Sequence, residues 1–164
     1  MKSKVILVSI LLMPITFLVY AQTSDAEAEA MANLLGVQKK EIIMKLVPVS
    51  GKDSVTFWKL YGEYQQKNNA MAKGRIQLYE KTALSYNNMT PALADSFAQK
   101  YFINRTQQET TLEEYYKKIK SSTNAIVAFE FYQAEVYLLT QVRAVIMQQI
   151  PTYGEFHNAV KKKE

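Results

Sequence analysis

The chain has 164 residues, no cysteine, and 20 basic against 15 acidic residues. This length suits one domain, and a chain without cysteine cannot be braced by disulfides, so its stability must come from packing. The basic residues are scattered apart from short clusters and lack a Gly-rich or base-stacking motif, which argues against nucleic acid as a partner.

Residues 1–21 have the pattern of a secretory signal peptide. A positively charged start precedes an apolar run over 5–19, and Val19 and Ala21 place small residues at the −3 and −1 positions of a cleavage site. The alternative is an uncleaved anchor, but the run is shorter than the roughly 20 residues that span a bilayer. We therefore expect cleavage after Ala21, a periplasmic location and no stable membrane span after processing. The mature chain keeps 18 basic and 15 acidic residues, a net charge of +3.

Helical periodicity dominates the mature chain, residues 22–164, and no segment alternates like a strand. We expect a single domain with a loose start at 22–25 and a C-terminal tail at 152–164. Thr90 is suited to cap a helix that starts at Pro91. The pattern predicts an all-α fold of about four helices: one carrying apolar positions between 31 and 46, then 54–86, 91–119, and a last helix that ends near 150.

The second and third helices are long enough to make an elongated antiparallel hairpin. At 1.5 Å per residue each would span about 45 to 50 Å. A turn centred near Asn88 aligns their apolar stripes and brings two polar patches together. This register pairs Phe57 with Ile119, Tyr61 with Tyr115, Tyr64 with Leu112, and Asn68 with Gln108.

Several large rings lie off the apolar stripes of their helices. In the last helix we expect the core-facing stripe to be Phe129, Tyr132, Val136, Leu139, Arg143, Ile146 and Ile150. The off-stripe rings either pack against the first helix or form an interaction surface, which Tyr and Trp suit because a rigid ring gives much contact area at little entropic cost. Both readings stay open. The candidate client- or partner-binding residues are Trp58, Tyr61, Phe102, Tyr116, Phe131 and Tyr137.

The order of motifs resembles the Spy/CpxP-like group of bacterial periplasmic proteins. FWKLYGEY follows a helix-breaking segment, a T-P restart follows a long helix, and EEYYKKIKS precedes FEFYQAE and QQIP. The resemblance is closer to the branch common in Bacteroidetes, which has F-W-x-x-Y-x-x-Y and F-[FY]-Q-x-E segments, and it covers roughly residues 34–151. No L-T-x-x-Q motif occurs. The matching positions are Phe57, Trp58, Tyr61, Tyr64, Phe131, Tyr132, Gln133 and Glu135.

The resemblance implies a bent helical hairpin that dimerises into a cradle, and a non-enzymatic role in envelope stress. His157 is the only histidine, and no serine or threonine has a nucleophile-elbow context, so we expect no enzyme, no metal and no cofactor. Two functions remain. One is an ATP-independent holdase for unfolded proteins, and the other is a regulator that restrains the periplasmic domain of a stress sensor or an anti-sigma factor. A homodimer is expected in either case.

Overall fold

The computed structural model describes residues 38–147, and this part of the chain is entirely α-helical apart from turns and connections. A helical segment covers residues 38–46. It is followed by α2 (Lys52–Ser85), a short 3-10 turn η1 (Tyr86–Asn88), α3 (Pro91–Ser122) and α4 (Ala125–Met147). The predicted all-α fold is confirmed. The loose start at 22–25 and the tail at 152–164 lie outside the described residues.

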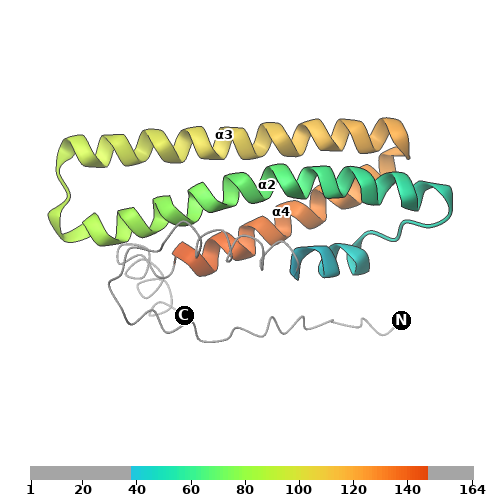
Figure 1. Ribbon diagram of the computed structural model, residues 1–164, viewed down its shortest axis with the longest axis horizontal. Helices are drawn as coiled ribbons and strands as arrows, with labels where there is room; N and C mark the ends of the chain where they lie inside the picture. Colours follow the sequence, from blue (N-terminus) through green and yellow to red (C-terminus); the bar gives the residue numbers. More distant parts are fainter. Residues whose placement is uncertain (1–37, 148–164) are drawn as a thin grey trace, which may run out of the picture.

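Helices α2 and α3 form the long antiparallel hairpin that the sequence predicts (Figure 1). The connection between α3 and α4 lies at the end of the hairpin opposite the α2–α3 turn, so α4 runs back along the molecule. Segment 38–46 lies at the level of α4, separated from the start of α2 by a short connection (Figure 1). The described helices are therefore arranged as an elongated bundle.

Local sequence sets the ends of the helices. Gly51 precedes α2 with a φ of 60°, which favours glycine. Thr90 caps α3 as predicted, because its hydroxyl accepts a hydrogen bond from the Leu93 amide at 3.2 Å, and Pro91 opens the helix. The Asn124 side chain caps α4 by accepting from the amides of Ile126 and Val127 at 2.9 and 3.0 Å.

The hairpin register differs from the predicted one by about one helical turn. The Tyr64 ring contacts Tyr115, with centroids 5.6 Å apart, where a turn at Asn88 predicts Leu112. Further along, the hydroxyls of Thr82 and Tyr101 lie 2.9 Å apart. The physical reason is the turn itself. The 3-10 turn carries the chain to Asn88 before it reverses, so the hairpin centre lies nearer Thr90.

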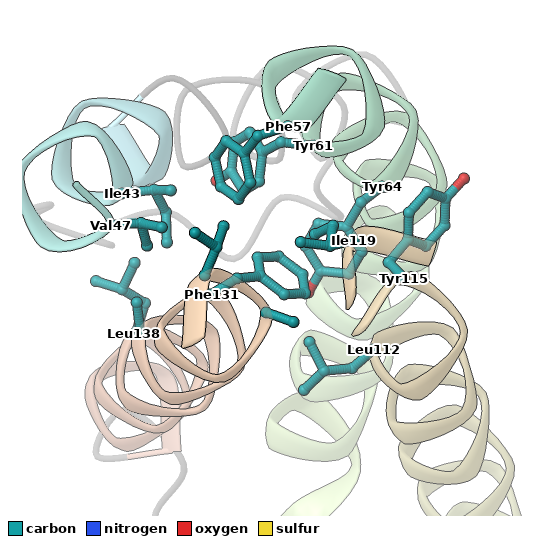
Figure 2. Packing of buried hydrophobic residues seen from close by; sticks show 13 residues of the cluster. Ile43, Val47, Phe57, Tyr61, Tyr64, Leu112, Tyr115, Ile119, Phe131 and Leu138 are labelled. Atoms are coloured by element: carbon teal, nitrogen blue, oxygen red, sulfur yellow. The ribbon is translucent and has the colours of Figure 1, made fainter. Parts of the chain in front are cut away.

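The core lies at the end of the hairpin where α2 begins. Side chains from all four helical segments meet there (Figure 2). Phe131 from α4 stands edge-on to three rings of α2, and its centroid lies 5.3 Å from that of Tyr64, 6.2 Å from that of Tyr61 and 6.4 Å from that of Phe57. Aromatic pairs in this geometry add to the free energy of burial. The buried rings of α2, α3 and α4 thus fill one end of the hairpin seam.

Candidate interaction surface and buried polar centre

Helix α4 is apolar on two opposite faces, and the structure buries the face that was not predicted to meet the core, although Val136 of the predicted stripe also packs against the core cluster. The buried face consists of Val127, Ala128, Phe131, Ala134, Glu135 and Leu138. The prediction that Phe129 and Tyr132 face the core is wrong. Small alanines let α4 approach its neighbours closely, and the fully buried Glu135 finds partners there. A stripe chosen by the size of its apolar side chains misses both effects.

The opposite face exposes four large side chains. We name it the α4 outer stripe, and its exposed fractions are 71% for Ile126, 53% for Phe129, 37% for Tyr132 and 52% for Tyr137. At 100° per residue these positions share one side of the helix. The other exposed positions on that side are uncharged, namely Ala125, Gln133, Thr140 and Ala144, and the partly exposed Glu130 lies at its edge. Such an apolar strip on a surface helix is typical of a contact surface.

Of the predicted binding residues, Phe102 and Tyr137 are well exposed, at 64% and 52%. Phe102 belongs to α3, where its neighbour Ile103 is also exposed. Both rings are therefore accessible to a partner. No pattern in the sequence indicated that these two rings are exposed while other candidate binding residues are buried.

Tyr61 and Phe131 are core residues, with 1% and 0% of their surface exposed, so neither can contact a partner in this structure. This corrects their assignment as binding residues. Tyr61 lies on the inner side of α2, and Phe131 lies on the face of α4 that carries the alanines. Figure 2 shows both rings directed into the cluster.

Trp58 and Tyr116 are partly buried and pack against the core. The indole of Trp58 is edge-on to Phe57, with ring centroids 4.9 Å apart, so it shields the core at the surface of α2. Tyr116 makes an edge contact with Tyr132 at 6.3 Å. This contact extends the α4 outer stripe onto α3.

A polar centre lies inside the aromatic core. The fully buried Glu135 accepts hydrogen bonds from Lys39 Nζ at 2.6 Å, Tyr64 OH at 2.7 Å and Tyr61 OH at 3.3 Å. Gln65 Nε2 donates to the Tyr61 hydroxyl at 2.5 Å. Sequence reasoning matched Glu135 to a motif but found no partner for it, because Lys39 is 96 residues away along the chain.

Burial and the charge of Glu135 raise the pKa of Tyr61 and of Tyr64 above the ordinary tyrosine value of 10.0. Desolvation is the larger cause for both phenols, since an apolar environment disfavours phenolate. The two hydroxyls therefore remain hydrogen-bond donors to the carboxylate at neutral pH. These hydrogen bonds stabilise the buried carboxylate of Glu135 and join α4 to α2.

Among residues 38–147, no group of three or more His, Asp and Glu side chains is placed to hold a metal ion. In the same range, no helix combines the length and apolar character needed to cross a membrane. His157 and the predicted signal peptide lie outside the described residues.

Comparison with known proteins finds no matching family model, no matching curated protein and no matching solved structure. The similarity to Spy/CpxP-like proteins therefore rests on the motifs quoted above. The cradle shape that it implies stays a hypothesis, as do export, dimerisation and chaperone activity.

Proposed function

We propose that the mature protein is a non-enzymatic holdase of the bacterial envelope that binds apolar segments of unfolded proteins without ATP. The α4 outer stripe is the observation that carries this proposal. Four large apolar side chains lie on one side of this helix, with the partly exposed Glu130 at the edge of the stripe. Unfolded polypeptides expose apolar side chains. These side chains can bind an apolar surface of this kind in many different sequences, so the surface does not select one client.

Two further features support the proposal. The aromatic core and the hydrogen bonds from Tyr61 and Tyr64 to Glu135 fix α4 on the hairpin from its inner face, so the outer stripe sits on a rigid support. A rigid surface loses little conformational entropy when it binds. The location in the envelope rests on the signal-peptide pattern of residues 1–21.

The test is aggregation of several unrelated denatured proteins in the presence of the purified mature chain. We expect wild type to suppress aggregation without ATP, and Phe129→Gln with Tyr137→Gln to lose most of this effect. Val55→Gln is the matched control, because Val55 is an exposed apolar residue on α2, outside the stripe. Phe102→Gln reports whether the exposed ring of α3 contributes. Thermal unfolding of each variant shows that the fold is retained.

A regulatory role is the second candidate. A single continuous strip on one helix also fits one specific partner, such as the periplasmic domain of a stress sensor. If wild type protects no client at several-fold molar excess, the holdase proposal is wrong and the regulator becomes the better account.

Sedimentation measurements on wild type test the proposed homodimer. The same measurements on the stripe variant test whether the α4 outer stripe forms the dimer interface. A dimer that persists in the Phe129→Gln, Tyr137→Gln variant leaves the stripe available to clients. A dimer that this variant dissociates would assign the stripe to self-association instead.

A further inference from the structure

A groove runs along the seam between α2 and α3, separate from the α4 outer stripe. Two hollows of about 480 and 310 Å³ form it, and Gln107 lines both of them. At 100° per residue, Lys67, Gly74 and Lys81 of this lining lie on the side of α2 that faces away from Tyr61, which contacts α4. We name this surface the hairpin groove, and from Lys67 to Lys81 it is about 21 Å long.

The hairpin groove combines an apolar floor with hydroxyl groups. Leu78 of α2 and Phe97 of α3 line it and are only 8% and 6% exposed, and Ile103 beside them is 58% exposed. Further along, Thr106 and Thr110 line the wall on the α3 side. Their hydroxyls can donate and accept hydrogen bonds, which the main-chain groups of a bound peptide need when they leave water. The lining therefore suits a peptide with apolar side chains.

The hairpin groove carries positive charge that is not balanced by its own lining. Three lysines line it, and no aspartate or glutamate of residues 38–147 does. At one end Lys67 pairs with Glu114, with Nζ and Oε1 3.1 Å apart. At the other end, no ion pair joins Lys81 or Lys100 to an acidic residue of the described chain. Lys100 Nζ lies 5.9 Å from the ring centroid of Phe97, so this ammonium group is held near the apolar floor.

We propose that the hairpin groove binds an extended peptide segment of another protein, in which apolar residues are combined with at least one carboxylate. At about 3.3 Å per residue, a groove of this length takes about six residues. Apolar side chains of the segment cover Leu78 and Phe97, and its carboxylate lies between Lys81 and Lys100, where both ammonium groups attract it. The groove selects acidic segments, and this inference does not depend on the holdase proposal.

The test is fluorescence anisotropy of a labelled hexapeptide of apolar residues that ends in two glutamates, titrated with the mature chain. We expect saturable binding to wild type, and about tenfold weaker binding when glutamines replace the glutamates, because two exposed charge pairs are lost. Lys81→Gln with Lys100→Gln should weaken binding of the glutamate peptide by a similar factor and give both peptides the same affinity. Lys59→Gln with Lys120→Gln is the matched control, because it removes one exposed lysine from each of the same helices outside the groove.

Two glycines of α2 allow a second test that leaves the charge unchanged. Gly74 lines the hairpin groove and Gly62 does not, and a Cβ atom at either position would meet no atom within 4 Å. Gly74→Leu should fill the hollow and abolish peptide binding, whereas Gly62→Leu should bind the peptide as wild type does. Both substitutions should raise Tm, because glycine is unfavourable inside a helix. A loss of binding in Gly74→Leu would then not be caused by unfolding.

The proposal is wrong if wild type does not bind the glutamate peptide, if it binds both peptides equally, or if Gly74→Leu keeps wild-type affinity. Saturable binding of dodecanoate in place of the peptide would assign the groove to an anionic amphiphile instead. Sedimentation tests a second copy as the occupant, because Gly74→Leu would then dissociate a dimer. The Phe129→Gln, Tyr137→Gln variant should bind the peptide as wild type does, so failure of the α4 outer stripe as a client site and failure of the groove are distinguished.

Discussion

Lys39 and Glu135 form a buried ion pair, with Nζ and Oε2 2.6 Å apart, although 96 residues separate them in the chain. The pair ties segment 38–46 to α4, and the same carboxylate accepts from two tyrosines of α2. One side chain of α4 therefore holds two other helical segments. This contact stabilises the fold only while both charges are present, because a lone buried charge is unfavourable.

Removing either charge should destabilise the protein strongly. Glu135→Gln is expected to lower the free energy of unfolding by about 3–5 kcal/mol, the usual cost of leaving one partner of a buried pair alone. Lys39→Met should act in the same direction, and the double variant should lose less than the two single losses added together. Chemical denaturation measures all three. Glu113→Gln, which breaks the exposed Glu113–Lys117 pair, is the control and should have little effect. Wild-type stability in Glu135→Gln would contradict the ion pair.

The two faces of α4 can be distinguished with two phenylalanines that are two positions apart. Phe131→Ala should cost about 3–5 kcal/mol of unfolding free energy, because it deletes a fully buried ring. Phe129→Ala should change stability little, because just over half of that ring is exposed. Urea unfolding of both variants checks the assignment. The opposite order would restore the face predicted from sequence and place the outer stripe in the core.

Much of the fold follows from local sequence signals. The bounds of α2 and the start of α3 come from periodicity, from a helix-breaking segment and from the Thr90–Pro91 cap, all of which act within a few residues. The register of the hairpin does not follow in the same way. It depends on whether the chain adds a 3-10 turn after Ser85, and the sequence around Asn87 is compatible with more than one turn.

Periodicity alone could not predict which face of α4 is buried. Both sides of this helix carry apolar residues at helical spacing, so the pattern shows that two stripes exist without ranking them. The choice depends on Glu135, which can be buried only where Lys39 and the tyrosine hydroxyls meet it. Those contacts are remote in the chain. The sequence accordingly predicted Phe129 in the core and left open whether Phe131, Phe102 and Tyr137 are core or surface rings, and the structure buries Phe131 while it exposes the other three.

Processing of the exported chain is a separate prediction. We expect the mature protein to begin at Gln22, because Ala21 is the small residue at the −1 position and the preceding apolar run is short for a membrane span. Intact-mass measurement on material from the periplasmic fraction checks this directly. A mass that still includes residues 1–21, found in the membrane fraction, would refute both cleavage and the proposed location.

Alkaline pH should destabilise the protein through the two buried tyrosines of the polar centre. Their pKa is raised in the folded state by burial and by Glu135, whereas in the unfolded chain each phenol titrates near its ordinary value of 10.0. Below pH 10.0 both states hold the phenolic protons, so the full stability is present. Above it the unfolded chain releases protons that the folded chain retains, and proton release favours unfolding.

The free energy of unfolding should therefore fall as pH rises above 10.0 and keep falling until the folded phenols ionise. Denaturation curves between pH 8 and about pH 11 measure the slope. The Tyr61→Phe, Tyr64→Phe variant should be less stable at pH 8, because Glu135 loses two hydrogen bonds, and its stability should decline less steeply above pH 10.0. An identical slope in this variant and in wild type would show that other groups cause the alkaline loss, and that these two hydroxyls are not buried beside a carboxylate.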